Sequence, residues 1–183
     1  MIESELEPTF KYIVRQEPDR GRICGLKHVV NRRLLDPPLV FELQPVNETN
    51  PCDSVICHLT IFSADRKNNL SVLVKKDGMV LETMVGDNVV NCDWFTDPVD
   101  HLSKLFIVIP NISVRIVGQF CLQYHLVDLK SGYTVRGFTK PFEIYSNKIF
   151  PGNLETTQLT TSFIKQGIRI RTKEPSVKDP QNE

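Results

Sequence analysis

The chain has 183 residues, of which 40% are apolar and 24% charged, and its 22 basic and 22 acidic side chains give no net charge. This is the composition of an ordinary globular protein, which excludes collagen-like and wholly disordered chains. The length suits one domain with short tails, and no apolar run approaches the ~20 residues of a membrane-spanning helix.

Both ends of the chain are polar. Residues 1–9 are acidic and residues 174–183 contain little apolar surface, so we expect both to be disordered around a folded unit of residues 10–173. The start lacks the apolar stretch of a secretory signal. Five cysteines without such a signal indicate reduced thiols in the cytosol or nucleus.

The first predicted strand, residues 10–16, is followed by a long basic segment. Residues 17–38 are rich in Arg, Gly and Pro and are predicted to form a loop, and loops of this length are often functional. Glycines allow backbone N–H groups to approach a phosphate, and arginines bind phosphate through two parallel hydrogen bonds. The segment contains no aromatic residue for base stacking, which favours duplex DNA over single strands or RNA.

Alternating apolar and polar residues predict many further strands, since a strand with one buried face repeats every two residues. The pattern is clearest at residues 39–44, 55–62 and 119–127. The other predicted strands are 70–74, 79–83, 104–109, 113–117, 133–138, 141–145 and 168–172. Many short strands separated by turn residues favour an antiparallel, immunoglobulin-type β-sandwich.

Two segments depart from this pattern. Residues 84–103 mix acidic residues and glycine with Trp94 and Phe95, and we expect a long loop or insertion there. Residues 160–166 are predicted to form one short helix, capped by Thr160 or Thr161 and ended by Gly167.

The residues that could carry out chemistry do not form a recognisable site. Cys52, Cys57 and His58 lack the paired spacing of zinc ligands, and on a strand Cys57 would face the core while His58 faces out. The chain also has no nucleophile elbow, no phosphate-binding glycine loop and no dinucleotide fingerprint. We therefore expect no catalytic residues, no metal site and no cofactor.

Charge is distributed unevenly along the chain. Residues 15–33 have a net charge of +4, residues 34–101 of −7, and residues 102–183 of +5. This asymmetry points to a localised anion-binding surface, although solvated loops and strand faces would give the same count.

Several blocks of sequence are distinctive in their order and spacing, and together they cover most of the chain. The blocks are Gln16–Gly25, Asn31–Arg33, Asp36–Pro38, Ile109–Gly118 and Pro141–Gly152, continued by Thr156, Leu159, Phe163 and Gln166–Arg171. In this order and spacing they resemble the velvet domain of fungal developmental regulators.

The resemblance implies an all-β sandwich like the Rel/NF-κB DNA-binding domains. It further implies a nuclear protein, with a cytoplasmic pool left open, that binds double-stranded DNA and regulates transcription in sporulation, development and secondary metabolism. Implied partners are other velvet proteins, in a homo- or heterodimer, and a LaeA-like methyltransferase-type regulator. The family's DNA contacts map onto Arg20, Arg22, Lys27, Arg32 and Arg33.

This chain departs from the family pattern within the basic loop. It has Val30 and Asn31 where relatives carry Lys-Asp, and Leu34 where a proline is common. It also has Leu39 where relatives often carry a third proline after the diproline. The loop is therefore less basic than in its relatives. A second hypothesis stays open on this ground, namely a protein-interaction subunit that dimerises with a DNA-binding partner without contacting DNA itself.

Overall fold

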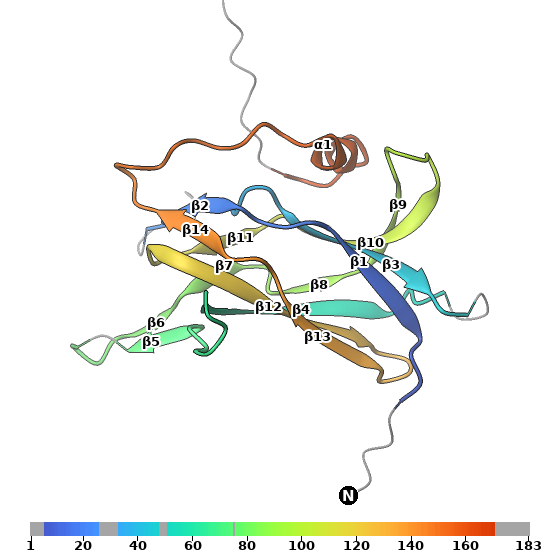
Figure 1. The fold of residues 1–183 in the computed structure, drawn as a ribbon, viewed down its shortest axis with the longest axis horizontal. Helices are drawn as coiled ribbons and strands as arrows, with labels where there is room; N and C mark the ends of the chain where they lie inside the picture. The colour runs from blue at the N-terminus through green and yellow to red at the C-terminus, as the bar shows by residue number, and fades with distance from the viewer. Residues whose placement is uncertain (1–5, 26–32, 48–50, 75, 171–183) are drawn as a thin grey trace, which may run out of the picture.

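The computed structural model describes residues 6–25, 33–47, 51–74 and 76–170, and these contain fourteen strands and one helix (Figure 1). The strands, in chain order, are β1 (Phe10–Gln16), β2 (Arg20–Arg22), β3 (Leu39–Pro45), β4 (Val55–Ser63), β5 (Val72–Val74), β6 (Val80–Glu82), β7 (Met84–Gly86), β8 (Val89–Asn91), β9 (Asp93–Thr96), β10 (Ser103–Ile109), β11 (Ile112–Val114), β12 (Gly118–Asp128), β13 (Thr134–Phe138) and β14 (Phe142–Tyr145). The helix is α1 (Gln158–Lys165).

Two curled sheets form the body of the fold. The first has the order β1-β3-β10-β9, and the second has the order β2-β14-β12-β4-β8, with β13 also paired to β12. Neighbouring strands are antiparallel, except that β2 and β14 run parallel. The small pairs β11-β7 and β5-β6 are separate sheets, and the β5–β6 hairpin projects from the body (Figure 1). The expected all-β sandwich is confirmed, and its likeness to Rel/NF-κB domains stays a prediction.

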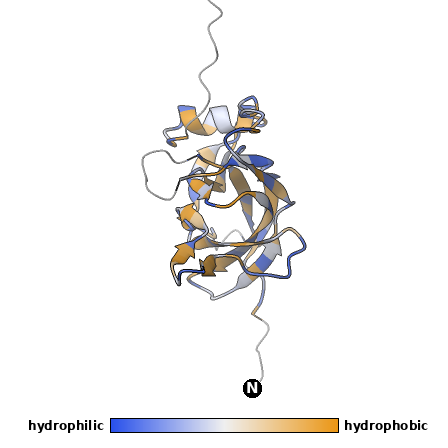
Figure 2. Ribbon diagram, turned by 90° about the vertical axis from the view of Figure 1, so that its left-hand side faces the viewer, coloured by the Kyte–Doolittle hydropathy of each residue, from blue (hydrophilic) through white to orange (hydrophobic). Residues whose placement is uncertain are grey.

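The core lies between the two sheets, where the curled layers enclose apolar segments (Figure 2). Phe41 and Ile107 reach it from the first sheet, and Leu59, Leu122 and Leu126 reach it from the second. The alternation predicted for β4 is confirmed, because Cys57 is fully buried whereas His58 is exposed.

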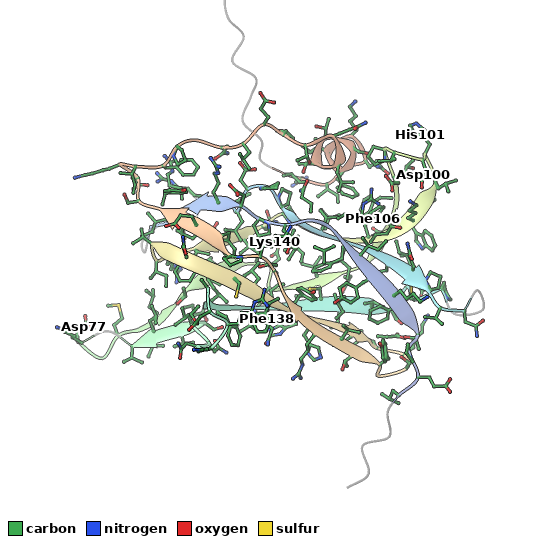
Figure 3. All side chains as sticks on the ribbon, viewed as in Figure 1. Asp77, Asp100, His101, Phe106, Phe138 and Lys140 are labelled. Atoms are coloured by element: carbon green, nitrogen blue, oxygen red, sulfur yellow. The ribbon has the colours of Figure 1, made fainter. Side chains whose placement is uncertain are left out.

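A second, smaller core joins α1 to the outer face of the first sheet. Thr157 caps the helix by accepting a hydrogen bond from the backbone N–H of Thr160 at 3.0 Å. Phe163 is fully buried, with its ring 5.2 Å from the rings of both Phe95 and Phe106. Phe106 lies between the sheet and α1 in Figure 3. Phe163 is therefore the one apolar side chain of α1 that is fully buried.

Several element predictions need correction. The helix begins at Gln158 and its cap is Thr157, two to three residues before the predicted start. Residues 84–103 contain β7, β8, β9 and the first residue of β10, rather than one long loop. The predicted strand 113–117 is displaced to β11.

The last predicted strand, residues 168–172, is wrong in its described part. Residues 168–170 form no strand, because the N–H of Ile168 bonds the carbonyl of Phe163 at 3.0 Å. Ile168 and Ile170 pack instead on the second core, while Arg169 is exposed. Disorder in the tails stays a prediction, and residues 1–5 and 171–183 lie outside the described residues.

A buried carboxylate ties the start of β1 to the turn between β12 and β13. Asp128 is fully buried and accepts hydrogen bonds from the hydroxyls of Thr9, Ser54 and Ser131 at 2.8, 2.6 and 2.7 Å. Burial alone would raise the pKa of Asp128, but these hydrogen bonds outweigh it and lower the pKa to about 2.

This depressed pKa predicts a dependence of stability on acid. Because the folded-state pKa lies below the ordinary value, the stabilisation is present above about pH 4 and is lost as the pH falls towards 2. Asp128→Asn should lower the free energy of unfolding by about 1–3 kcal/mol at pH 7 and weaken its acid dependence. Urea unfolding at pH 7 and pH 3 measures both effects. The exposed control Glu155→Gln should match the parent, and an Asp128→Asn curve identical to the parent's would contradict the role.

No helix in the described part of the chain is long and apolar enough to cross a membrane.

Candidate nucleic-acid interface

Strand β2 places two of the predicted DNA-binding arginines on the same side of the chain. Arg20 and Arg22 alternate with Gly21 along β2, so both arginines point away from the face on which Gly21 packs. A Cβ at Gly21 would lie 2.8 Å from Ile144 Cδ1 and 3.0 Å from Leu35 Cδ2. Glycine at this position therefore lets β2 approach the rest of the sheet closely. A loop was predicted over residues 17–38, and β2 corrects that prediction.

The other end of the basic segment is also fixed to the sandwich. Asp36 exchanges two backbone hydrogen bonds with Arg20, at 2.8 and 3.0 Å. The N–H of Leu35 bonds the carbonyl of Ile112 at 2.8 Å, so Arg33 directly precedes an anchored segment. Lys27 and Arg32, the remaining predicted site residues, lie outside the described residues.

The three described arginines differ in what they contact. The Nε of Arg20 donates to Asp19 at 2.8 Å, which partly neutralises its charge. The guanidinium of Arg22 lies over the ring of Phe150, 5.4 Å from its centroid, and Arg33 donates to the side-chain oxygen of Asn147. Among the described residues, neither Arg22 nor Arg33 forms an ion pair.

Arg22 and Arg33 line one pocket of about 220 Å³, together with Phe150, Asn153 and Leu154 from the segment that connects β14 to α1. Asp36 also lines this pocket and accepts a hydrogen bond from the backbone N–H of Leu154 at 2.6 Å. Burial raises the pKa of Asp36, although this N–H and the charge of Arg20 oppose the shift. The pocket therefore combines two guanidinium groups with one carboxylate, and its net charge is positive.

A further arginine, Arg115, lies close to this group, because the N–H of Cys24 bonds the carbonyl of Val114, the residue before Arg115, at 2.9 Å. Burial raises the pKa of the Cys24 thiol, while the nearby charges of Arg115 and Arg33 act in the opposite direction. Arg115 also donates to the carbonyl of Glu82 at 3.1 Å. Positive charge from β2, from the segment at Arg33 and from the residue after β11 is thus gathered at one end of the sandwich.

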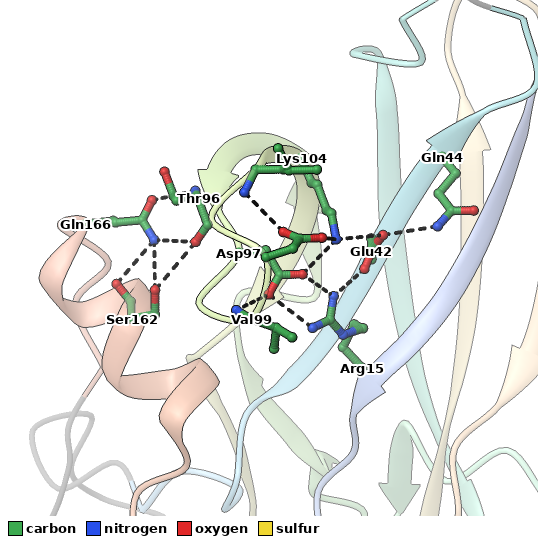
Figure 4. A network of polar contacts seen from close by, with 11 residues as sticks. Arg15, Glu42, Gln44, Thr96, Asp97, Val99, Lys104, Ser162 and Gln166 are labelled. Carbon is green, nitrogen blue, oxygen red and sulfur yellow. Dashed lines mark hydrogen bonds and ion pairs between the residues drawn. The ribbon is translucent and has the colours of Figure 1, made fainter.

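Much of the negative charge in residues 84–103 is neutralised within the fold (Figure 4). Asp97 is buried and contacts Arg15 and Lys104 at 2.7 and 2.9 Å, and Lys104 also contacts Asp100 at 2.5 Å. Glu42 is buried beside the same two cations. The hydrogen bond from Arg15 is the main reason that the pKa of Asp97 lies far below its usual range. The acidic segment is therefore less negative than its sequence suggests, and Arg15 and Lys104 are structural.

Sequence reasoning did not place Asn147 or Phe150 at this interface. Both follow β14, which reaches the arginines only because it runs parallel to β2, with Tyr145 opposite Arg22. Residues 141–152 formed one of the blocks resembling the velvet family, and that was the only sequence signal for them. Among the described residues, no group of three or more His, Cys, Asp or Glu side chains is arranged to hold a metal ion.

A comparison with known protein families identifies the family of this chain. The family model described as "Velvet factor" matches residues 10–77 and 62–177. The chain belongs to the velvet family. The sequence resemblance is therefore confirmed, and the family consists of regulatory proteins rather than enzymes.

Curated relatives of this velvet chain are named as developmental regulators. It is 28% identical to the spore development regulator VOSA of Pyricularia oryzae, over 96% of this chain and 35% of that protein. It is 27% identical to the sexual development regulator umv3 of Mycosarcoma maydis, over 88% and 44%. It is 28% identical to the developmental and secondary metabolism regulator veA of Aspergillus fumigatus, over 89% and 35%. The chain thus spans less than half the length of each of these relatives.

Proposed function

We propose that this velvet chain binds double-stranded DNA in the nucleus and regulates transcription in fungal development, sporulation and secondary metabolism. It acts as a homo- or heterodimer with other velvet proteins. The names of its relatives support the regulatory role. One observation supports the DNA-binding role above all others. Arg22 and Arg33 line the same pocket, and neither forms an ion pair with another described residue.

Phosphate binding is the chemistry that suits these two side chains. A guanidinium group presents several N–H donors in a fixed fork that matches phosphate oxygens. Stacking on Phe150 leaves the in-plane donors of Arg22 available, and the hydrogen bond to Asn147 uses only one donor group of Arg33. Arg20 is expected to contribute less because Asp19 already occupies its Nε.

Lys27 and Arg32 belong to the same proposal. Lys27 and Arg32 fall between two described residues that are hydrogen-bonded to β11: the N–H of Cys24 bonds the carbonyl of Val114 at 2.9 Å, and the N–H of Leu35 bonds that of Ile112 at 2.8 Å. Their proximity in sequence to Arg22 and Arg33 suits contacts with further phosphates of the same duplex.

A protein-interaction role is the second candidate. The β5–β6 hairpin projects from the sandwich and carries Val74 and Val80 opposite each other, 71% and 65% exposed. Asp77 marks its tip in Figure 3. One relative, from Chaetomium globosum, is named as a component of a velvet complex. In this alternative the hairpin contacts a velvet partner or a LaeA-like regulator, and the partner alone contacts DNA.

Duplex binding by the isolated protein distinguishes the two candidates. Fluorescence anisotropy with a 30-base-pair duplex should show binding that weakens about 100-fold between 50 and 200 mM salt if about four phosphates are contacted. Gel filtration with light scattering, with and without a second velvet protein, reports the assembly. Absence of binding at 50 mM salt, together with DNA binding by the mixed complex, would favour the protein-interaction role.

A further inference from the structure

An exposed turn lies beside the two arginines. Residues 147–149 form this turn, one residue after β14, whose last residue, Tyr145, pairs with Arg22. Asn147, Lys148 and Ile149 are all exposed, and Ile149 is 68% accessible to solvent. The turn therefore belongs to the same surface as the pocket, although it comes from a distant part of the sequence.

Contacts on both sides fix the position of the turn. The rings of Tyr145 and Phe150, which flank it, meet edge to face with centroids 6.1 Å apart. Arg22 stacks on Phe150, and Arg33 donates to Asn147. A turn held at both ends presents its exposed side chains at defined positions, which contact with a base requires.

The two outermost side chains of the turn suit different parts of a duplex. Lys148 offers a point charge to a phosphate and forms no ion pair among the described residues. Ile149 has no attraction to phosphate, and a single exposed aliphatic residue would ordinarily need no explanation. Here it stands next to Lys148, on a surface that also carries Arg22 and Arg33. An apolar side chain that enters the major groove can contact the methyl group of thymine.

We infer that the turn at residues 147–149 is a second DNA-contacting element, in which Lys148 binds a phosphate and Ile149 contacts a thymine methyl group. This inference rests on the proposed function, since it assumes that Arg22 and Arg33 grip the same duplex. The arginines then position the protein, and Ile149 contributes sequence preference.

A selection experiment identifies the base that Ile149 contacts. The parent is used to enrich a randomised pool of duplexes, and Ile149→Ala, Lys148→Ala and two controls are then measured on the selected DNA. Leu129→Ala, 63% exposed in the turn between β12 and β13, matches the loss of an aliphatic side chain. Lys11→Ala, exposed near the start of β1, matches the loss of a cation.

The decisive comparison removes the thymine methyl group by replacing thymine with uracil at each selected position. At one or two positions the change to uracil should lower the affinity of the parent about fourfold, because one methyl group loses its apolar contact. At the same positions the change should not alter the affinity of Ile149→Ala. Lys148→Ala should weaken binding on all sequences and reduce the salt slope by about 0.9. Both controls should behave as the parent.

The outcomes separate this inference from the proposed function. If the parent binds no duplex, the proposed function fails and the inference with it, whereas a parent that binds all duplexes equally and enriches none overturns only the inference. If the parent binds but responds to uracil in the same way as Ile149→Ala, or if Lys148→Ala keeps the parent's salt slope, the turn does not contact DNA and only the inference is overturned. Uracil sensitivity lost specifically in Ile149→Ala supports the inference.

Discussion

Replacing Gly86 with alanine is expected to lower the free energy of unfolding by more than about 3 kcal/mol. Gly86 has a φ of +125°, which L-residues rarely adopt, and an added Cβ would lie 1.5 Å from the carbonyl oxygen of Asn111. The clash is with backbone that pairs β7 to β11, so no side chain can rotate away to relieve it. Urea unfolding followed by circular dichroism measures the loss.

Gly152 provides the matched control for this substitution. Its φ is +98°, but an added Cβ would meet no atom within 4 Å. Gly152→Ala should therefore cost only the backbone strain, about 1–2 kcal/mol. Equal losses in the two variants would show that the close approach of Asn111 to Gly86 does not determine the cost.

Phe163→Ala is expected to cost about 3–5 kcal/mol and to detach α1 from the first sheet. Phe163 is fully buried between Phe95 and Phe106, and an eight-residue helix has little stability of its own. Because Thr157 and Thr160 line the pocket that holds Arg22, loss of the helix should also disturb the arginine surface. Thermal unfolding and hydrogen exchange of residues 158–165 measure these effects.

Lys165→Ala is the control within the same helix. Lys165 is exposed, so its replacement should change the free energy of unfolding by no more than about 0.5 kcal/mol. Full protection of α1 from exchange in Phe163→Ala would contradict the assignment of Phe163 as the anchor of the helix.

Long strands with one buried face were predictable from sequence. Burial alternates from Val55 to Phe62 in β4 and from Leu122 to Asp128 in β12, and this period is visible without any knowledge of the partner strands. Short edge strands were not predictable in this way. In β9, Asp93, Trp94 and Thr96 are all exposed, and the strand exists through its pairing with β10.

The segment at residues 168–170 shows how the same signal can mislead. Its two isoleucines alternate with Arg169 as in a strand and do face apolar residues. Their partners, however, are on α1 and the outer face of the first sheet, so the segment packs without joining a sheet. Period-two patterning reports which residues are buried, not which backbone they pair with.

The candidate site was only partly predictable for a related reason. Arginine and glycine content marked residues 17–38, but nothing local indicated that Arg20–Arg22 would form a strand. That strand depends on the close fit of Gly21 against Ile144, more than 120 residues away in the sequence. The same long-range pairing brings Asn147 and Phe150 to the arginines, and local sequence patterns do not report such contacts.

The salt dependence of duplex binding by Arg22→Ala/Arg33→Ala tests the central claim most directly. If both arginines contact phosphates, the slope of log affinity against log salt should fall by about 1.8 relative to the parent, or about 0.9 for each lost contact. Lys11→Ala/Lys67→Ala, which removes two cations from other exposed positions, should keep the parent's slope. A folded Arg22→Ala/Arg33→Ala protein with an unchanged slope would contradict the assignment of this surface to DNA.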